Sequence, residues 1–361
     1  MKATLQKFSL IVAGIIGAIV FFEMTLWVLP RSLLPARMGD LAERMEMSRR
    51  SDKMFVPDRE LLFKIPPHTD FIAKHPEYTI RVKTNLNLDD IGFRGGSLGG
   101  PAWGVAVGDS FTFSVGVDLE KSWPHLLAKS LGREVLNLGI PAQGPAQYTR
   151  VLKRYALPMR PHVVFYGFYY NDLQASHRFY RFKRNFLPID RYIRHYSLTY
   201  NLIQDLKRSP ANSENALESD VEGMNFSAES IAKSLARQYN KFAQRWELTE
   251  RELKEAIDAS NEANVRLIIL YLPSRGQVYW DLLTKGENLP AALQIDKLPI
   301  TVMKFCNAQR LACLDLTGPL KNEARQGKQL YFTIDGHWNE KGNQVVAAAI
   351  QKFLATEGIV P

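Results

Sequence analysis

From Ala102 onward, short apolar runs with strand character alternate with segments of helical spacing, and this alternation constrains the fold more than any other feature of the chain. The five apolar runs are residues 103–107, 134–138, 162–168, 265–272 and 312–316. They are almost continuously apolar, as is typical of strands that helices bury on both faces. The pattern predicts an α/β fold with a five-stranded parallel sheet between two layers of helices.

Two helix boundaries can also be predicted in this region. Thr249 and Glu252 have the spacing of a capping box, which predicts that the long helix before 265–272 begins there. The final helix is expected to begin near Asn339 and to end near Ala355. Residues 173–226 contain no clear strand and are interpreted as an insertion.

The N-terminus has a different character. From Phe8 to Leu29 the chain runs for 22 residues with one charge, Glu23, and a helix needs about 20 apolar residues to cross a bilayer. Lys2 and Lys7 precede this run, and no A-x-A cleavage pattern follows closely. We therefore expect an uncleaved single-pass anchor in the cell (inner) membrane. We expect its N-terminus inside, so that the rest of the chain is periplasmic or extracellular.

The remaining boundaries follow from composition. The 361 residues are 46% hydrophobic and 23% charged, which is typical of globular proteins and excludes disordered, collagen-like and multi-span classes. We predict the anchor at 1–30, a charged juxtamembrane stalk at 31–53 and a small β-containing preface at 54–101. The main domain follows at 102–361. The preface contains a strand-like stretch at 78–88 and a Gly-rich linker after it.

Four short motifs carry the candidate chemistry. Ser110 follows the first strand in G-D-S, Gly139 follows the second, Asn171 follows the third, and Asp335 and His337 precede the last helix. Sites in open α/β sheets form at the carboxyl ends of strands. Each motif alone has a more common structural explanation: a capping serine, a loop glycine, an Asn-Asp turn, and a capping aspartate beside a surface histidine.

Taken together and in this order, the motifs resemble those of the SGNH (GDSL-like) hydrolases. The resemblance implies a flavodoxin-like αβα sandwich in which Ser110 is the nucleophile, His337 the general base and Asp335 the residue that orients it. It also implies an oxyanion hole made by the N–H groups of Ser110 and Gly139 and by the side chain of Asn171.

Three details refine the resemblance. The chain has D-x-H where many members have D-x-x-H, and the shorter form resembles members associated with bacterial polysaccharide acetylation. Ser114 stands where relatives commonly have glycine. The stretch N-L-N-L-D-D-I-G-F-R-G-G at 85–96 resembles the lead-in of membrane-anchored members.

The resemblance implies a serine esterase that acts through an acyl-serine intermediate. We expect it to hydrolyse acyl esters, in particular O-acetyl groups on an envelope or exported polysaccharide. One alternative is an O-acyltransferase that uses the same residues and receives its acyl donor from a multi-span membrane partner. A second alternative is a non-catalytic carbohydrate-binding or anchor protein.

The net charge of +9 is concentrated in one segment. Residues 173–208 hold eight Lys/Arg against two Asp/Glu, with seven aromatic residues interleaved between Phe179 and Tyr200. The segment is interpreted either as a surface for an anionic polymer or lipid headgroups or as a solvated basic face. No recognised nucleic-acid motif accompanies it, so no nucleic-acid partner is expected.

The chain contains two cysteines, Cys306 and Cys313. Outside the cytoplasm they could form a disulfide; the other interpretation is two small buried residues, and the sequence leaves both open. The sequence has no P-loop, G-x-G-x-x-G or C-x-x-C motif, and its histidines lack metal-ligand spacing. We therefore predict neither a cofactor nor a metal ion.

Overall fold

A computed structural model describes residues 2–29, 54–96, 101–184, 197, 199–200, 228–283 and 295–359. The chain divides into two compact units, Met1–Met54 with Asn185–Asn215, and Phe55–Arg184 with Ala216–Pro361. In the first unit, α1 (Lys2–Val28) covers the apolar run predicted to be an anchor. Within the described residues, no helix qualifies as long and apolar enough to cross a membrane. The predicted stalk at 31–53 lies outside the described residues.

The second unit contains the predicted parallel sheet of five strands. These are β7 (Ala102–Val107), β8 (Glu134–Asn137), β9 (Val163–Tyr169), β10 (Arg266–Leu272) and β11 (Ala312–Asp315). Their spatial order is β11-β10-β9-β7-β8, and all neighbouring pairs are parallel. This is the flavodoxin-like order, in which β8 is added on one side of β7 and the later strands on the other, so that the strand order reverses between β7 and β9. The predicted fold class and sheet are confirmed.

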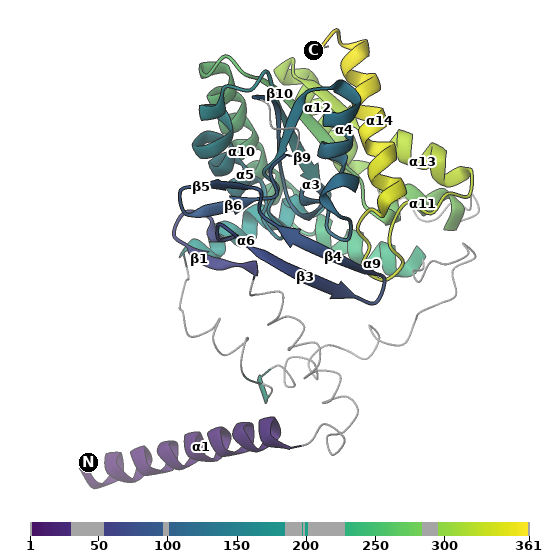
Figure 1. Cartoon of the computed structure of the whole chain (residues 1–361). Helices are drawn as coiled ribbons and strands as arrows, with labels where there is room; N and C mark the ends of the chain where they lie inside the picture. Colours follow the sequence, from purple (N-terminus) through teal and green to yellow (C-terminus); the bar gives the residue numbers. More distant parts are fainter. Residues whose placement is uncertain are drawn as a thin grey trace. The chain divides into compact units, whose positions relative to one another are not determined.

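Helices cover both faces of this sheet. On one face α4 (Trp123–Leu131) packs against α14 (Glu340–Thr356), and on the other α5 (Pro145–Val151) packs against α10 (Phe242–Glu262) (Figure 1). The remaining described helices are α3 (Ser110–Phe113), α6 (Asp172–Arg184), α9 (Ala228–Tyr239), α11 (Arg275–Leu283), α12 (Lys297–Gln309) and α13 (Thr317–Arg325). Single turns of 3-10 or π-helix lie at Leu119–Lys121, Leu152–Ala156 and Leu157–Met159.

One helix start differs from the prediction. The helix α10 begins at Phe242, so Thr249 and Glu252 lie inside it, both buried, and the predicted capping box is wrong. Both side chains lie on the buried face of the helix, where the Glu252 carbonyl accepts a hydrogen bond from Thr149 (3.1 Å). For α14 the prediction is confirmed, because Asn339 caps it by accepting a hydrogen bond from the Gly342 N–H (3.0 Å).

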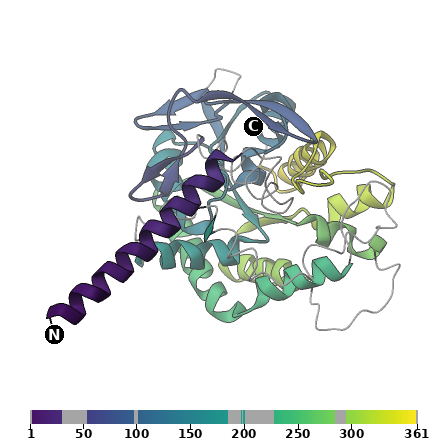
Figure 2. The same cartoon turned by 90° about the horizontal axis from the view of Figure 1, so that it is seen from below.

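The segment before the main sheet forms three antiparallel hairpins. They are β1 (Val56–Asp58) with β2 (Leu62–Lys64), β3 (Asp70–His75) with β4 (Tyr78–Lys83), and β5 (Leu86–Leu88) with β6 (Ile91–Phe93). The predicted strand-like stretch at 78–88 is therefore two strands. Figure 2 shows these blue and purple hairpins lying across the rest of the second unit. The hairpins and the parallel sheet belong to the same compact unit.

Candidate active site

Ser110 lies at the point where β7 gives way to α3. Asp109 caps α3 by accepting a hydrogen bond from the Phe111 N–H (2.9 Å). The strand end is also tied to the neighbouring loop, because the Ile140 N–H donates to the carbonyl of Gly108 (3.0 Å). Ser110 thus stands at a helix N-terminus and at the carboxyl edge of the sheet, beside the switch between β7 and β9, where such folds bind their ligands.

The structure brings Ser110, His337 and Asp335 together. The Oγ of Ser110 and the Nε2 of His337 are 2.8 Å apart, and the Nδ1 of His337 is in hydrogen-bond contact with the Oδ1 of Asp335. The imidazole ring lies against the ring of Phe111, with 4.9 Å between centroids. A serine hydroxyl on one ring nitrogen and a carboxylate on the other is the arrangement of a serine–histidine–aspartate triad.

Asp335 is held as an anion. Burial by itself would raise the pKa of this carboxyl. The hydrogen bond and charge of His337, together with the Tyr78 hydroxyl that donates to Oδ2 (2.8 Å), outweigh burial and lower the pKa to about 2. An ionised carboxylate orients the imidazole and stabilises the imidazolium formed when the ring accepts a proton.

Two buried carboxyls lie near the serine. Burial raises the pKa of Asp109 to about 6. Burial and the neighbouring charge of Asp109 also raise the pKa of Asp172, which accepts hydrogen bonds from the Tyr148 hydroxyl and the Tyr169 N–H (each 3.0 Å). The first bond connects the start of α6 to α5, and the second connects it to the end of β9.

Gly139 packs directly against α3, the short helix that begins at Ser110. A Cβ at this position would lie 2.4 Å from the Phe113 nitrogen and 2.8 Å from the Thr112 carbonyl carbon, so only glycine fits. Its N–H donates to the side-chain oxygen of Asn137 (3.0 Å). The predicted role of this N–H in an oxyanion hole would require it to exchange that bond for one to substrate.

Asn171 follows β9, the strand next to β7 in the sheet. Its carbonyl accepts the Gln174 N–H (2.9 Å) at the start of α6, and its side chain is half-buried. Within the part of the chain that the structure describes, the Asn171 carboxamide forms no hydrogen bond.

A cavity of about 220 Å³ adjoins the triad. Asp335, Gly336 and Arg275 form part of its wall. Arg275 Nη1 donates to the Thr333 carbonyl (2.6 Å). The other lining residues come from β9 and its end, from α9 and from the start of α11: Tyr169, Tyr170, Ile231, Ser234, Leu235, Ser274 and Gly276.

Three residues that support this site lie outside the four sequence motifs that predicted it. Glu77 and Tyr78, from the β3–β4 hairpin, bond to the loop that holds Asp335. Arg94 is buried and donates to the carbonyls of Phe113 (2.7 Å), at the end of α3, and of Ser114 and Val117 (each 3.0 Å), which follow it. The G-F-R lead-in was a signal for Arg94. For Glu77 and Tyr78 the only signal was the strand-like stretch that begins at residue 78.

The basic and aromatic segment at 173–208 is described only in part, as α6 and residues 197, 199 and 200. In α6, Phe179 is buried beneath the guanidinium of Arg150, and Tyr180 is hydrogen-bonded to Glu252 on α10. These two aromatic side chains pack within the unit instead of facing solvent. The rest of the segment lies outside the described residues.

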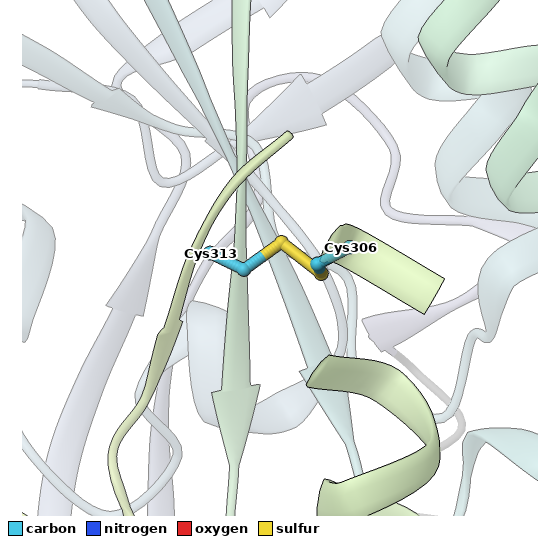
Figure 3. Close-up of a disulfide and its surroundings, with 2 residues drawn as sticks. All are labelled: Cys306 and Cys313. Atoms are coloured by element: carbon cyan, nitrogen blue, oxygen red, sulfur yellow. A yellow bond between two sulfur atoms is a disulfide. The ribbon is translucent and has the colours of Figure 1, made fainter. Parts of the chain in front are cut away.

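The two cysteines form a disulfide between α12 and β11 (Figure 3), with 6.2 Å between their Cα atoms. The disulfide interpretation of Cys306 and Cys313 is thus the one the structure supports. Among the described residues, no group of three or more His, Cys, Asp or Glu side chains is placed to hold a metal ion.

Known proteins resemble this chain in part. Residues 226–360 match the family described as the SGNH hydrolase-like domain of acetyltransferase AlgX. The probable alginate O-acetylase AlgJ of Azotobacter vinelandii is 31% identical over 98 residues, which is 27% of this chain and 24% of that protein. The alginate biosynthesis protein AlgX of Pseudomonas putida is 32% identical over 120 residues, which is 30% of this chain and 24% of that protein.

The chain thus spans about a quarter of the length of the curated relatives it matches. Among solved structures, the acetyl xylan esterase AlAXEase aligns with a TM-score of 0.39 at 14% identity, over 69% of this chain and 98% of that one. A likeness of that size carries no information on activity. The resemblance to SGNH proteins that modify polysaccharides with O-acetyl groups is confirmed. The family match includes Asp335 and His337 but not Ser110, Gly139 or Asn171.

Proposed function

We propose that this protein transfers acyl groups, principally O-acetyl groups, on a polysaccharide through an acyl-serine intermediate at Ser110. The observation that carries the proposal is the 2.8 Å contact between Ser110 Oγ and His337 Nε2, with Asp335 on the opposite ring nitrogen. A serine hydroxyl is a weak nucleophile unless an adjacent base removes its proton, and His337 is in hydrogen-bond contact with this hydroxyl.

The reaction takes place in two halves. Ser110 Oγ attacks the ester carbonyl carbon while its proton moves to His337 Nε2, and the tetrahedral intermediate expels the alcohol, which takes that proton. An acceptor hydroxyl then attacks the acyl-serine, gives its proton to His337 and leaves with the acyl group. Ser110 regains a proton from His337, so the enzyme returns to its starting state.

The negative oxygen of each tetrahedral intermediate needs fixed hydrogen-bond donors. The Ser110 N–H at the start of α3 and the Asn171 carboxamide are the proposed donors. Gly139 joins this set only if its N–H leaves the Asn137 oxygen, and its closely packed backbone limits how far it can move.

The names of the relatives, an alginate O-acetylase and an alginate biosynthesis protein, support a polysaccharide as the second reactant.

Water and a sugar hydroxyl are the two candidate acceptors, and they define the esterase and the acetyltransferase. The resemblance to SGNH hydrolases supports an esterase. The acetyltransferase is favoured by the matched family, because the description of that family names the acetyltransferase AlgX. An acetyltransferase would require an acyl donor delivered by a multi-span membrane partner.

One experiment tests the proposal and separates its two forms. The full-length protein in detergent is labelled with a fluorophosphonate, beside Ser110→Ala and His337→Ala. Labelling of the wild type alone supports an activated serine. Radiolabelled acetyl ester is then supplied with polysaccharide: label released to water indicates an esterase, and label retained on the glycan indicates a transferase. Wild-type protein that is folded, unlabelled and indistinguishable from Ser110→Ala would favour a non-catalytic binding protein.

We further propose that the protein acts in the cell envelope, held by residues 1–30 as a single-pass anchor. The disulfide supports this location, because disulfides persist outside the reducing cytoplasm, and the polysaccharide-modifying relatives agree with it. Alkaline phosphatase fused after Pro361 should be active. An inactive phosphatase together with an active cytoplasmic reporter at the same position would contradict the location.

A further inference from the structure

The tip of the β3–β4 hairpin lies against the loop that carries Asp335 and His337, as the blue hairpin and the yellow loop before α14 show in Figures 1 and 2. Pro76 and Glu77 form the two-residue turn of this hairpin. The Glu77 carboxylate accepts hydrogen bonds from three consecutive backbone N–H groups, those of Thr333 (2.5 Å), Ile334 (2.9 Å) and Asp335 (2.8 Å).

Three successive N–H groups that converge on one anion form a nest, a backbone shape that stabilises negative charge. Here the occupant is a carboxylate from 256 to 258 residues earlier in the same chain. Burial would raise the pKa of Glu77, but these backbone hydrogen bonds outweigh it and lower the pKa. At neutral pH Glu77 is therefore an anion that fixes the backbone of the loop immediately before His337.

Tyr78 contacts the side chain of Asp335 itself, whereas Glu77 contacts only the backbone of the loop. Its hydroxyl donates to Asp335 Oδ2 (2.8 Å), while Oδ1 faces His337. Each oxygen of the carboxylate thus has its own side-chain partner, which sets the rotation of the carboxylate plane. Burial and the charge of Asp335 raise the pKa of the Tyr78 phenol, so it remains a hydrogen-bond donor throughout the physiological range.

The Tyr78 ring is itself held from two sides. His75, its cross-strand partner, stacks on it with ring centroids 4.7 Å apart. Phe332, in the loop between α13 and α14, packs on it with ring centroids 4.9 Å apart. The phenol therefore cannot rotate away from Asp335 without breaking these contacts. Rigid packing of this kind is what holds a functional side chain in a productive geometry.

We propose that Glu77 and Tyr78 are positioning residues of the active site, which hold Asp335, and through it His337, in line with Ser110. This proposal rests on the proposed function. It makes the β3–β4 hairpin, which lies outside all four sequence motifs, a required part of the site.

The test compares full-length Tyr78→Phe and Glu77→Gln with Lys74→Ala, an exposed position on the same hairpin. Displacement of reacting groups by about 1 Å can cost about 100-fold in rate. We expect kcat to fall about 10- to 100-fold in Tyr78→Phe and Glu77→Gln, with KM and the thermal midpoint close to those of Lys74→Ala. Unchanged kcat, or a loss matched by a fall in the folded fraction, overturns the proposal.

A second readout does not depend on activity. Nitrogen-15 NMR of the His337 ring should show one tautomer in the wild type, with the proton on Nδ1 toward Asp335, and a mixture in Tyr78→Phe. If the wild type neither reacts with fluorophosphonate nor turns over, but Tyr78→Phe still loses the single tautomer, the proposed function fails and the positioning role stands. A tautomer unchanged in Tyr78→Phe overturns the positioning role alone.

Discussion

The two halves of the candidate site are supported in different ways. The nucleophile half, around Ser110, is built by the sheet: β7 ends there, α3 begins there, and Gly139 and Arg94 pack against the backbone that follows. The base half, around Asp335 and His337, lies outside the regular elements, on the loop between α13 and α14. It is held by side chains from other segments, namely Glu77, Tyr78 and Arg275.

This difference has a physical origin. The position of a residue at the end of a buried strand is fixed by the backbone hydrogen bonds of the sheet and by core packing. The loop that carries Asp335 and His337 has only a short backbone bridge, in which the Phe332 N–H donates to the His337 carbonyl (2.9 Å). Charge-assisted hydrogen bonds therefore add to its support, and these are about twice as strong as neutral ones. The nucleophile half should therefore respond mainly to steric changes, and the base half to changes in charge and hydrogen bonding.

The largest effect is expected for Ser110→Ala, which removes the reacting atom that both halves serve. Acyl transfer should fall by about 10⁴-fold or more, since the remaining groups only bind and polarise the ester. The thermal midpoint should stay close to that of the wild type. Steady-state turnover of a small acetyl ester measures the loss, with the exposed Ser130→Ala as the control. Wild-type activity in Ser110→Ala would mean that Ser110 is not the reacting residue, and the two halves would then not form one active site.

A smaller effect is expected for Gly139→Ala, a purely steric change in the nucleophile half. The added Cβ would meet the backbone at Phe113 and Thr112, which cannot move as a flexible side chain would. We expect a loss of about 1–3 kcal/mol in the free energy of unfolding and of about 100-fold in kcat. Denaturant unfolding and steady-state kinetics measure the two. Gly132→Ala, where a Cβ meets no atom within 4 Å but φ is +62°, provides a control for backbone strain alone. Equal losses in the two variants would contradict the steric explanation.

The disulfide gives a reference point away from both halves. Replacing Cys306 and Cys313 together by alanine should lower the free energy of unfolding by about 2–3 kcal/mol, since the closed loop is short. The kcat of the double variant should be unchanged. Denaturant unfolding with and without a reductant measures the first quantity. A large drop in kcat at full folding would mean that β11 transmits strain to the site.

The smallest effect is a pH dependence specific to the base half. Because the pKa of Asp335 is about 2 in the folded protein, below its ordinary value of 3.8, its ionisation stabilises the fold above about pH 4. This contribution should disappear as the pH falls from about 4 toward 2. Thermal unfolding across this range should show a shallower pH dependence for Asp335→Asn than for the wild type. The exposed Asp258→Asn should match the wild type, and a wild-type slope in Asp335→Asn would contradict this assignment.

Much of the fold could be predicted from the chain alone. The five strands were placed within a residue or so, because a buried strand leaves a continuous apolar run that needs no partner to be recognised. The capping box predicted at Thr249 was wrong because a local polar pattern, unlike a buried strand, can be interpreted only with its packing partners. Polar residues on a buried helix face share the spacing of a helix start, and only packing against Thr149 distinguishes the two.

The sequence by itself determined the order of strands and helices, since these follow from local periodicity. Its short motifs, which together resemble those of SGNH hydrolases, marked Ser110, Asp335 and His337 as candidate site residues. Only the tertiary structure decided what holds them. It placed Glu77 and Tyr78 against Asp335, committed the Gly139 N–H to Asn137, and joined Cys306 to Cys313. A single hydrogen bond between polar groups more than 250 residues apart leaves no periodic trace in the chain. Such contacts exist only once the sheet and its hairpins have brought the two segments together.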